Sequence, residues 1–139
     1  MEVTLLDTDI LSEFLKRRNS VVNEKGASYL QEHGQFTFSA FTRFEIRRGF
    51  LERQAVRQFE RFEEFCRHSL VLPVSDAVFD GACHLWVTAR QGGHPCGDTD
   101  LLIAATALVH KLTLSTGNMR HFDWVPNLTL IDWRGDQSP

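Results

Sequence analysis

The feature of this sequence that most constrains its fold is the alternation of short strand-like runs with longer segments of helical periodicity. Runs rich in Leu, Val, Ile, Phe and Thr, which favour strands, occupy residues 3–6, 35–39, 70–74, 112–116 and 128–131. Apolar residues recur at helical spacing between these runs. Alternating strands and helices predict an α/β fold, with a central, mostly parallel sheet of about five strands flanked by helices.

The helical segments carry predictions about their ends and buried faces. The helix that begins near Ala40 is expected to stop near Gly49, because glycine commonly ends helices. Two later helices are expected to bury one apolar stripe each. The first stripe consists of Val56, Phe59, Phe62 and Phe65, and the second of Phe79, Ala82, Leu85, Trp86 and Ala89.

Length and composition favour one domain. The chain has 139 residues, 42% of them hydrophobic, which suits a single core. We expect a domain over residues 1–134 and a flexible C-terminal tail over 135–139. The sequence shows no secretory signal and no apolar run long enough for a membrane span, so we expect a cytoplasmic protein with no membrane partner.

The distribution of charge says more than the net charge of −3. Basic residues gather around 16–18, 43–48 and 53–61, whereas several acids stand where strands are expected to end. One interpretation is a basic rim around an acidic centre, as in a nucleic-acid enzyme. The other is ordinary solvated helix faces with acidic partners three or four residues away.

Acidic and amide side chains follow the predicted strands. Asp7 closes the first strand, Glu45 lies in the helix after the second, and Asn118 follows the fourth. In a parallel sheet, ligands bind beyond the carboxyl ends of the strands, so these distant residues can converge. Several carboxylates brought together repel one another unless a cation compensates them, and oxygen ligands favour magnesium or manganese over zinc. The histidines show no zinc-site spacing.

Each acid also has a structural explanation. Asp7 could form a turn into the helix, but Asp9 already offers a helix cap there, so we assign Asp7 to function and Asp9 mainly to structure. Glu45 could complete a capping box with Thr42 or pair with an arginine. Its crowded, apolar neighbourhood favours a functional role.

Asp98 and Asp100 compete for one position in the site. Residues two apart point to nearly opposite sides of a helix, so only one of them faces the site squarely. Asp98 follows Gly97 and is well placed to be the helix N-cap. We therefore prefer Asp100 as the direct metal ligand, with Asp98 as a cap or a helper beside it.

Four segments together resemble the PIN-domain family, and in particular its VapC toxins, along nearly the whole chain. They are residues 6–12 (LDTDILS), 39–49 (SAFTRFEIRRG), 100–105 (DLLIAA) and 115–122 (STGNMRHF). The resemblance implies a magnesium- or manganese-dependent endoribonuclease that hydrolyses RNA phosphodiester bonds, tRNA or rRNA being examples of the substrate. It also implies a homodimer that a small partner antitoxin silences.

The resemblance also implies roles for individual residues. By position, Asp7, Glu45 and Asp100 would bind the metal, and Asn118 would be the fourth member of the catalytic site. Many family members have aspartate in place of Asn118, and a neutral amide holds a second metal less well, so one-metal and two-metal chemistry both stay open. The groups implied near the phosphate are Thr8, Asp9 and Thr116, and the implied RNA contacts are Arg43, Arg47, Lys16, Arg17 and Arg18.

Two other classes of protein compete with a nuclease. The acidic motifs at 7–9 and 97–100 resemble pieces of haloacid-dehalogenase-type phosphatases, but the lysine which that class needs is missing between Lys25 and Lys111. A PIN-like module that binds RNA or a protein without cutting is the second alternative. The full set of acids argues against it, and Asn118 argues for it.

Overall fold

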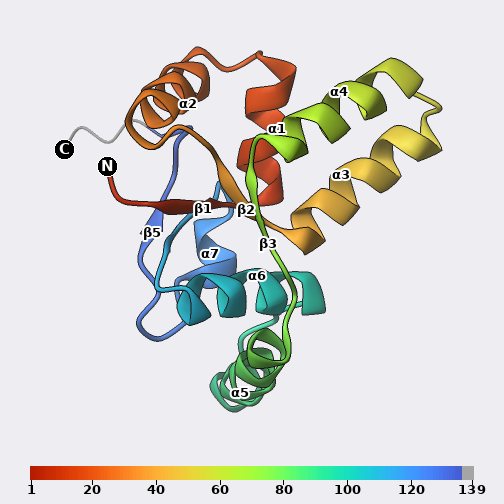
Figure 1. Ribbon diagram of the computed structural model, residues 1–139. Coiled ribbons are helices and arrows are strands. Elements are labelled where there is room, and N and C mark those ends of the chain that lie inside the picture. The colour runs from red at the N-terminus through yellow and green to blue at the C-terminus, as the bar shows by residue number, and fades with distance from the viewer. Residues whose placement is uncertain (136–139) are drawn as a thin grey trace.

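A five-stranded sheet forms the centre of the molecule, which is described here from a computed structural model over residues 1–135 (Figure 1). All of its neighbouring strands are parallel, and their spatial order is β3-β2-β1-β4-β5. The strands are β1 (Thr4–Leu6), β2 (Thr37–Ser39), β3 (Leu70–Leu72), β4 (Thr113–Ser115) and β5 (Leu130–Ile131). The predicted α/β architecture is confirmed, although each strand is shorter than its apolar run.

The order of the strands creates a crevice at one edge of the sheet. From β1 the chain moves outward to β2 and β3, and it then crosses over to place β4 on the other side of β1. The segments that follow β1 and β4 therefore lead away in opposite directions. Such a switch point, at the carboxyl ends of parallel strands, is where ligands bind in open α/β sheets.

Within residues 1–135, seven helices cover the two faces of the sheet. They are α1 (Thr8–Lys16), α2 (Ser20–His33), α3 (Ala40–Glu52), α4 (Val56–Arg67), α5 (Asp76–Gly92), α6 (Asp98–Val109) and α7 (Met119–Phe122). Helices α1 to α4 lie on one side of the sheet, and α5 to α7 lie on the other (Figure 1).

Alternation along the strands produces two cores. Leu5 of β1 packs with Val78 and Ile103 under α5 and α6, whereas its neighbour Leu6 packs with Ile10 and Trp133 on the opposite face. Successive side chains of a strand point to opposite faces, so a three-residue strand serves both layers. Burying each large apolar side chain contributes roughly 1.5–3 kcal/mol.

The prediction that α3 stops near Gly49 is wrong. The helix continues through Gly49 to Glu52. A glycine inside a helix costs about 1 kcal/mol relative to alanine. Ile46 is buried, and Phe50 packs against the same core, so apolar contacts on both sides of Gly49 outweigh that cost.

The predicted buried stripes are correct only in part. On α5 the buried residues include Val78, Ala82 and Leu85, whereas Phe79 and Trp86 are 51% and 46% exposed. The buried stripe is narrower than predicted and runs beside those two rings, because α6 covers only one side of α5. On α4, Phe62 is buried, Phe59 and Phe65 are partly buried, and Val56 is exposed.

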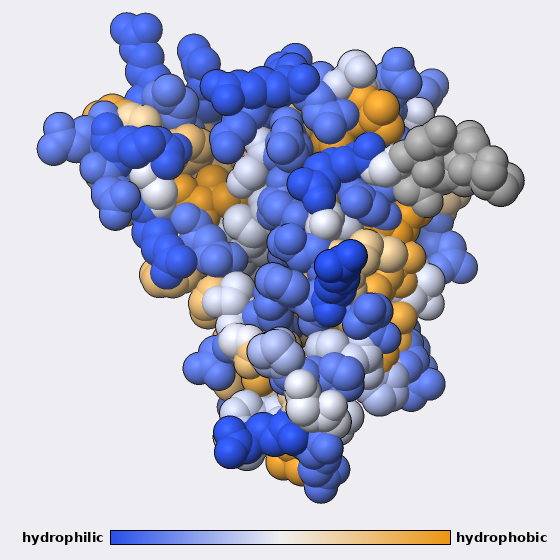
Figure 2. Space-filling model, turned by 180° about the vertical axis from the view of Figure 1, so that it is seen from behind, coloured by the Kyte–Doolittle hydropathy of each residue, from blue (hydrophilic) through white to orange (hydrophobic). Residues whose placement is uncertain are grey.

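The surface is mostly hydrophilic, with apolar side chains showing between polar ones on the side that carries α3 and α4 (Figure 2). A recess of about 410 Å³ lies there, lined by Phe50, Leu51, Gln54, Ala55, Val56 and Phe59. Within residues 1–135, no helix is long and apolar enough to cross a membrane. The flexible tail expected over 135–139 lies, apart from Gly135, outside the described residues.

Candidate active site

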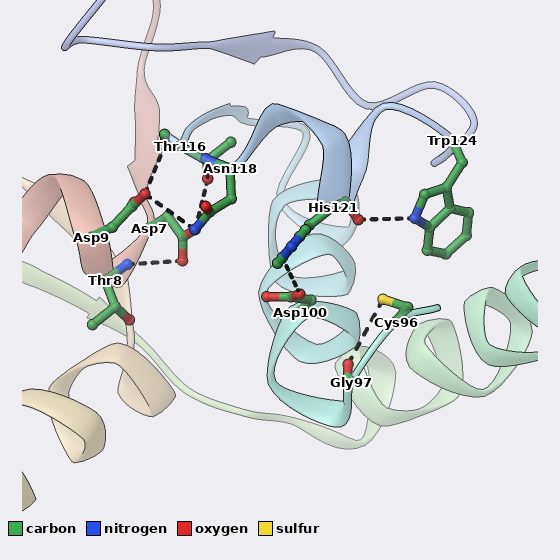
Figure 3. Close-up of polar contacts among 11 residues, drawn as sticks. Asp7, Thr8, Asp9, Cys96, Gly97, Asp100, Thr116, Asn118, His121 and Trp124 are labelled. Atoms are coloured by element: carbon green, nitrogen blue, oxygen red, sulfur yellow. Dashed lines mark hydrogen bonds and ion pairs between the residues drawn. The ribbon is translucent and has the colours of Figure 1, made fainter. Parts of the chain in front are cut away.

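Asp7 lies at the point where β1 ends and α1 begins. Its backbone N–H donates to the carbonyl of Ser115 at 2.9 Å. One carboxylate oxygen, Oδ1, accepts from the Thr8 N–H at 2.8 Å, and Oδ2 accepts from the Thr116 hydroxyl at 2.8 Å (Figure 3). Asp7 is therefore the N-cap of α1, and the prediction that Asp9 supplies this cap is wrong because the helix begins two residues earlier.

Asp7 is a buried carboxylate in negative surroundings. It is 7% exposed, and burial raises its pKa from 3.8 to about 6. The charges of Asp9 and Asp100 add to this rise in pKa, and the hydrogen bonds from Thr116 and Thr8 oppose it. Within the described part of the chain, none of the main contributions to the pKa of Asp7 comes from a basic group. A buried carboxylate without a cationic partner is the kind of group that binds a metal ion.

Asp9 ties the loop after β4 to helix α1. Its Oδ2 atom accepts from the Gly117 N–H at 2.9 Å and from the Asn118 amide nitrogen at 3.4 Å (Figure 3). Burial raises the pKa of Asp9, while the N–H groups of Gly117 and Ile10 and the nearby Arg134 lower it. Thr116 completes the loop by accepting from the Asn118 N–H at 3.0 Å. Asn118 therefore sits beside Asp9 at the crevice.

Glu45 reaches the site from α3 through Thr8. The Thr8 hydroxyl donates to Glu45 Oε1 at 2.7 Å and lies 3.1 Å from the hydroxyl of the fully buried Thr42. The alternative of a capping box between Thr42 and Glu45 is wrong, because Ser39 caps α3 by accepting from the Thr42 N–H at 3.0 Å. Arg48 lies 3.7 Å from Glu45 Oε2, so the arginine partner considered from the sequence is present.

Asp100 stands in the first turn of α6 and pairs with a histidine. Its Oδ2 atom lies 3.1 Å from His121 Nδ1 (Figure 3). The N-cap of α6 is Gly97, and Asp98 is an exposed first residue of the helix. The prediction that Asp98 caps the helix is wrong, because the helix already begins at Asp98. Asp100 is the better placed of the two acids, since its charge acts on Asp7.

The acids lie around one crevice but do not meet at one point. Among residues 1–135, no three His, Cys, Asp or Glu side chains converge closely enough to hold a metal ion together. Mg²⁺ commonly uses one or two carboxylates and keeps several waters. The carboxylate oxygens of Asp7 and Asp100 are hard donors that fit such an ion. Glu45 lies beside Thr8.

A groove of about 650 Å³ extends from Thr8 and Glu45 between α1 and α3. Its basic lining residues are Lys16, Arg18 and Arg53. The groove also includes Ser12, Leu15, Ile46, Gly49, Phe50 and Gln58. It joins the acidic crevice to a basic surface.

The residues expected to contact RNA are not all at this groove. Lys16 and Arg18 line it, whereas Arg17 is the exposed C-cap of α1 and is not among the lining residues. Arg47 lies against α4, with its Nε atom 2.9 Å from Glu63 Oε1 and its guanidinium over the Phe59 ring. Arg43 also faces α4, where its charge lowers the pKa of the Cys66 thiol against a rise caused mainly by burial.

Sequence reasoning missed several residues that the fold brings to the site. The Thr42 hydroxyl lies 3.1 Å from that of Thr8, His121 pairs with Asp100, and Arg134 lies beside Asp9. The three-residue spacing from Ser39 to Thr42 is a capping signal that could have found Thr42. No local pattern points to Arg134, because β5 brings it to the site from the end of the chain.

Comparison with known proteins agrees with this architecture. The model of the PIN domain family matches residues 4–126, and the chain belongs to the PIN-domain family. Among curated relatives it is 26% identical over 132 residues to Ribonuclease VapC1 of Haemophilus influenzae strain R2866, which covers 94% of this chain and 98% of the relative. Family membership rules out the phosphatase alternative.

Solved structures of VapBC proteins share the fold. VapBC-1 from nontypeable Haemophilus influenzae matches with a TM-score of 0.77 at 26% identity, covering 94% of this chain and 97% of that chain. DNA-bound VapBC from Salmonella typhimurium matches with a TM-score of 0.84 at 23% identity, covering 96% and 99%.

Proposed function

We propose that this protein is an endoribonuclease of the VapC toxin type that uses Mg²⁺ or Mn²⁺ to hydrolyse RNA phosphodiester bonds. The observation that carries the proposal is the buried carboxylate of Asp7 at the switch point of the sheet, with Asp9 and Asp100 close enough to raise its pKa. Similarity to Ribonuclease VapC1 along nearly the whole chain supports the same activity.

The carboxylates divide the work in this proposal. Asp7 and Asp100 hold the ion, and Glu45, fixed by the Thr8 hydroxyl, orients water at the edge of the site. The bound ion supplies positive charge that stabilises the phosphate in the transition state and makes the attacking water more acidic. The amide of Asn118, held by Asp9, donates to a phosphate oxygen, and its neutral side chain favours a single ion.

The groove between α1 and α3 holds the RNA backbone in this proposal. Lys16, Arg18 and Arg53 place positive charge along a path that ends at Thr8 and Glu45. Phosphate contacts of this kind give affinity without reading the base sequence. Their positions would bring one phosphodiester to the acids.

Two protein partners are proposed, namely an antitoxin and a second copy of this chain. We propose a small antitoxin that covers the site, because the chain is similar along its length to the VapBC-1 structure. We also propose a homodimer through α5, where Phe79, Trp86 and Val87 expose apolar area on one side of the helix. Exposed rings grouped in this way are typical of protein interfaces.

The test is RNA cleavage by the purified protein. A mixture of tRNA and structured RNA fragments is incubated with Mg²⁺, Mn²⁺ or a chelator, using the wild type and the Asp7→Asn, Asp100→Asn and Asp80→Asn variants. Asp80 is an exposed carboxylate on α5 and serves as the matched control. We expect metal-dependent cleavage that the first two variants abolish and the control retains.

The non-catalytic alternative keeps one observation in its favour, namely that no three metal-binding side chains converge within residues 1–135. RNA that is bound but stays intact under every metal condition would establish that alternative. Cleavage that persists in the chelator would contradict the metal-dependent mechanism.

A further inference from the structure

Arg134 packs against the loop that carries Asn118, although the two residues lie at opposite ends of the last β-α-β unit. Strand β5 pairs with β4, and the Thr116 N–H donates to the Ile131 carbonyl at 2.9 Å. Trp133 is fully buried, with its ring 5.5 Å from that of Tyr29. This anchor fixes the segment after β5 beside the loop after β4. Arg134 thus reaches the site from outside residues 4–126, the part that the family model matches.

Gly117 is the residue on which Arg134 packs. A Cβ atom placed on Gly117 would lie 2.5 Å from Arg134 Nε and closer still to Cζ and Nη2. Gly34 and Gly93 are the glycines with positive φ in the described part of the chain, so the backbone of Gly117 would accept alanine. A methyl group at this position would meet the guanidinium of Arg134, so the arginine and not the backbone would have to move.

The charge of Arg134 is placed between two acids. Its Nε atom lies 3.5 Å from Asp132 Oδ1, and its charge lowers the pKa of Asp9. Asp9 in turn accepts from Gly117 and Asn118. The guanidinium and the Asp9 carboxylate therefore hold the same loop, one by packing on Gly117 and the other by hydrogen bonds.

We propose that Arg134 is a positioning residue for the active site: by packing on Gly117 beside Asp9, it fixes the 116–118 loop so that Asn118 presents its amide to the RNA phosphate. The role of Asn118 in this inference rests on the proposed ribonuclease function. The packing of Arg134 on Gly117 does not depend on it. Arg134 acts through the loop and is not itself a catalytic residue.

The geometry predicts that the two residues act as one unit. Removing the arginine side chain frees the loop, and adding a methyl group to Gly117 displaces the arginine. Each change should therefore cause the same defect, and the second should add little once the first is present. Residues that share one contact show this non-additivity, whereas independent residues do not.

The experiment compares Arg134→Ala, Gly117→Ala and the double variant with the wild type. Arg120→Ala is the matched control, because Arg120 is an exposed arginine on α7 and is not among the nearest neighbours of a Cβ atom placed on Gly117. Amide hydrogen exchange of Gly117 is measured by NMR with the intact protein, thermal unfolding reports on the whole fold, and kcat and KM are measured on RNA.

We expect each single variant to exchange the backbone amide of residue 117 about tenfold faster and to lower kcat about tenfold, with KM changed less than about twofold. The double variant should match the single variants instead of reaching about a hundredfold, and the melting temperature should stay near that of the control. Additive effects, or an Arg134→Ala variant with unchanged exchange and kcat, would overturn the proposal. If the wild type cleaves no RNA, the proposed function fails, and the exchange data alone decide whether Arg134 fixes the loop.

Discussion

At the scale of the residue, the site is a compromise between stability and chemistry. Asp7 combines an N-cap role with burial in a negative environment, and its pKa of about 6 reports the cost of keeping it ionised. Its two hydrogen bonds offset part of this cost. The proposed cation site thus uses a carboxylate that keeps its proton more readily in the folded protein than in the unfolded chain.

The Asp7→Asn variant should therefore lose cleavage and gain stability. The folded state binds the Asp7 proton more tightly than the unfolded chain, so this residue destabilises the fold as the pH rises from about 4 to about 6, and the penalty is complete above that window. In chelator at pH 7.5, we expect the free energy of unfolding of the variant to exceed that of the wild type by about 1–3 kcal/mol. Near pH 4 the two free energies of unfolding should become equal. Urea unfolding at both pH values measures this difference. A variant less stable than the wild type at pH 7.5 would contradict the electrostatic account.

At the scale of the element, α3 shows how packing overrides local preference. The helix runs through Gly49, which places Arg53 after its end and lets Gly49 line the groove beside Arg18. A shorter helix would leave the groove without this wall. The length of α3 therefore affects the surface that we propose for RNA.

Replacing Gly49 with alanine tests both consequences of that length. The helix should gain roughly 0.5–1 kcal/mol, because alanine is the better helix former. The new methyl group would lie 3.3 Å from Arg53 Nη1, a flexible end that can move aside into the groove. We expect a higher melting temperature together with a raised KM for RNA. A raised melting temperature with an unchanged KM would show that RNA does not occupy this part of the groove.

At the scale of the whole molecule, the distribution of charge matters more than its sum. The net charge is −3, yet the groove carries Lys16, Arg18 and Arg53 beside the acidic crevice. The neighbouring arginines on α3 that looked equally suitable in the sequence face α4, and Arg47 forms an ion pair with Glu63. Binding of RNA should therefore depend on a few residues on one side of the molecule.

Substituting Lys16 and Arg18 with alanine should weaken RNA binding and its dependence on salt. Each lost phosphate contact lowers the slope of log affinity against log salt by about 0.7 for a single strand, so the double variant should lose about 1.4. Fluorescence anisotropy in the Asp7→Asn background measures binding without cleavage. Lys111→Gln is the control, since Lys111 precedes the amino end of β4, whereas the site lies beyond the carboxyl ends of the strands. An equal loss in the control would argue against a specific groove.

A substitution on the exposed face of α5 tests the proposed homodimer. Trp86→Arg places a charge beside Phe79 and Val87. Burying this charge would destabilise an interface, whereas a charge on the exposed surface of a monomer costs little free energy. We expect a dimer for the wild type and a monomer of unchanged melting behaviour for the variant, measured by light scattering after size-exclusion chromatography. A variant that stays dimeric would place the interface elsewhere.

The sequence by itself determined the class of fold and placed candidate acids directly after its strands. The five parallel strands follow from runs such as residues 4–6, whose side chains serve both cores, because the period of a strand is local. The position of Asp7 directly after β1 follows for the same reason. Local patterns failed at helix boundaries. The N-cap of α1 is Asp7, two residues before the predicted cap, and the N-cap of α6 is Gly97, one residue before the predicted cap.

Only the tertiary structure decided which side chains face one another. Trp86 was predicted to be buried, but its ring is exposed. Arg47 was expected to contact RNA, and in the structure it forms an ion pair with Glu63. Periodicity marks one face of a helix but does not say which neighbouring element covers that face. Arg134 lies beside Gly117 because β5 joins the sheet next to β4. Contacts between residues distant in the chain depend on the order of the strands, and no local segment of the sequence encodes that order.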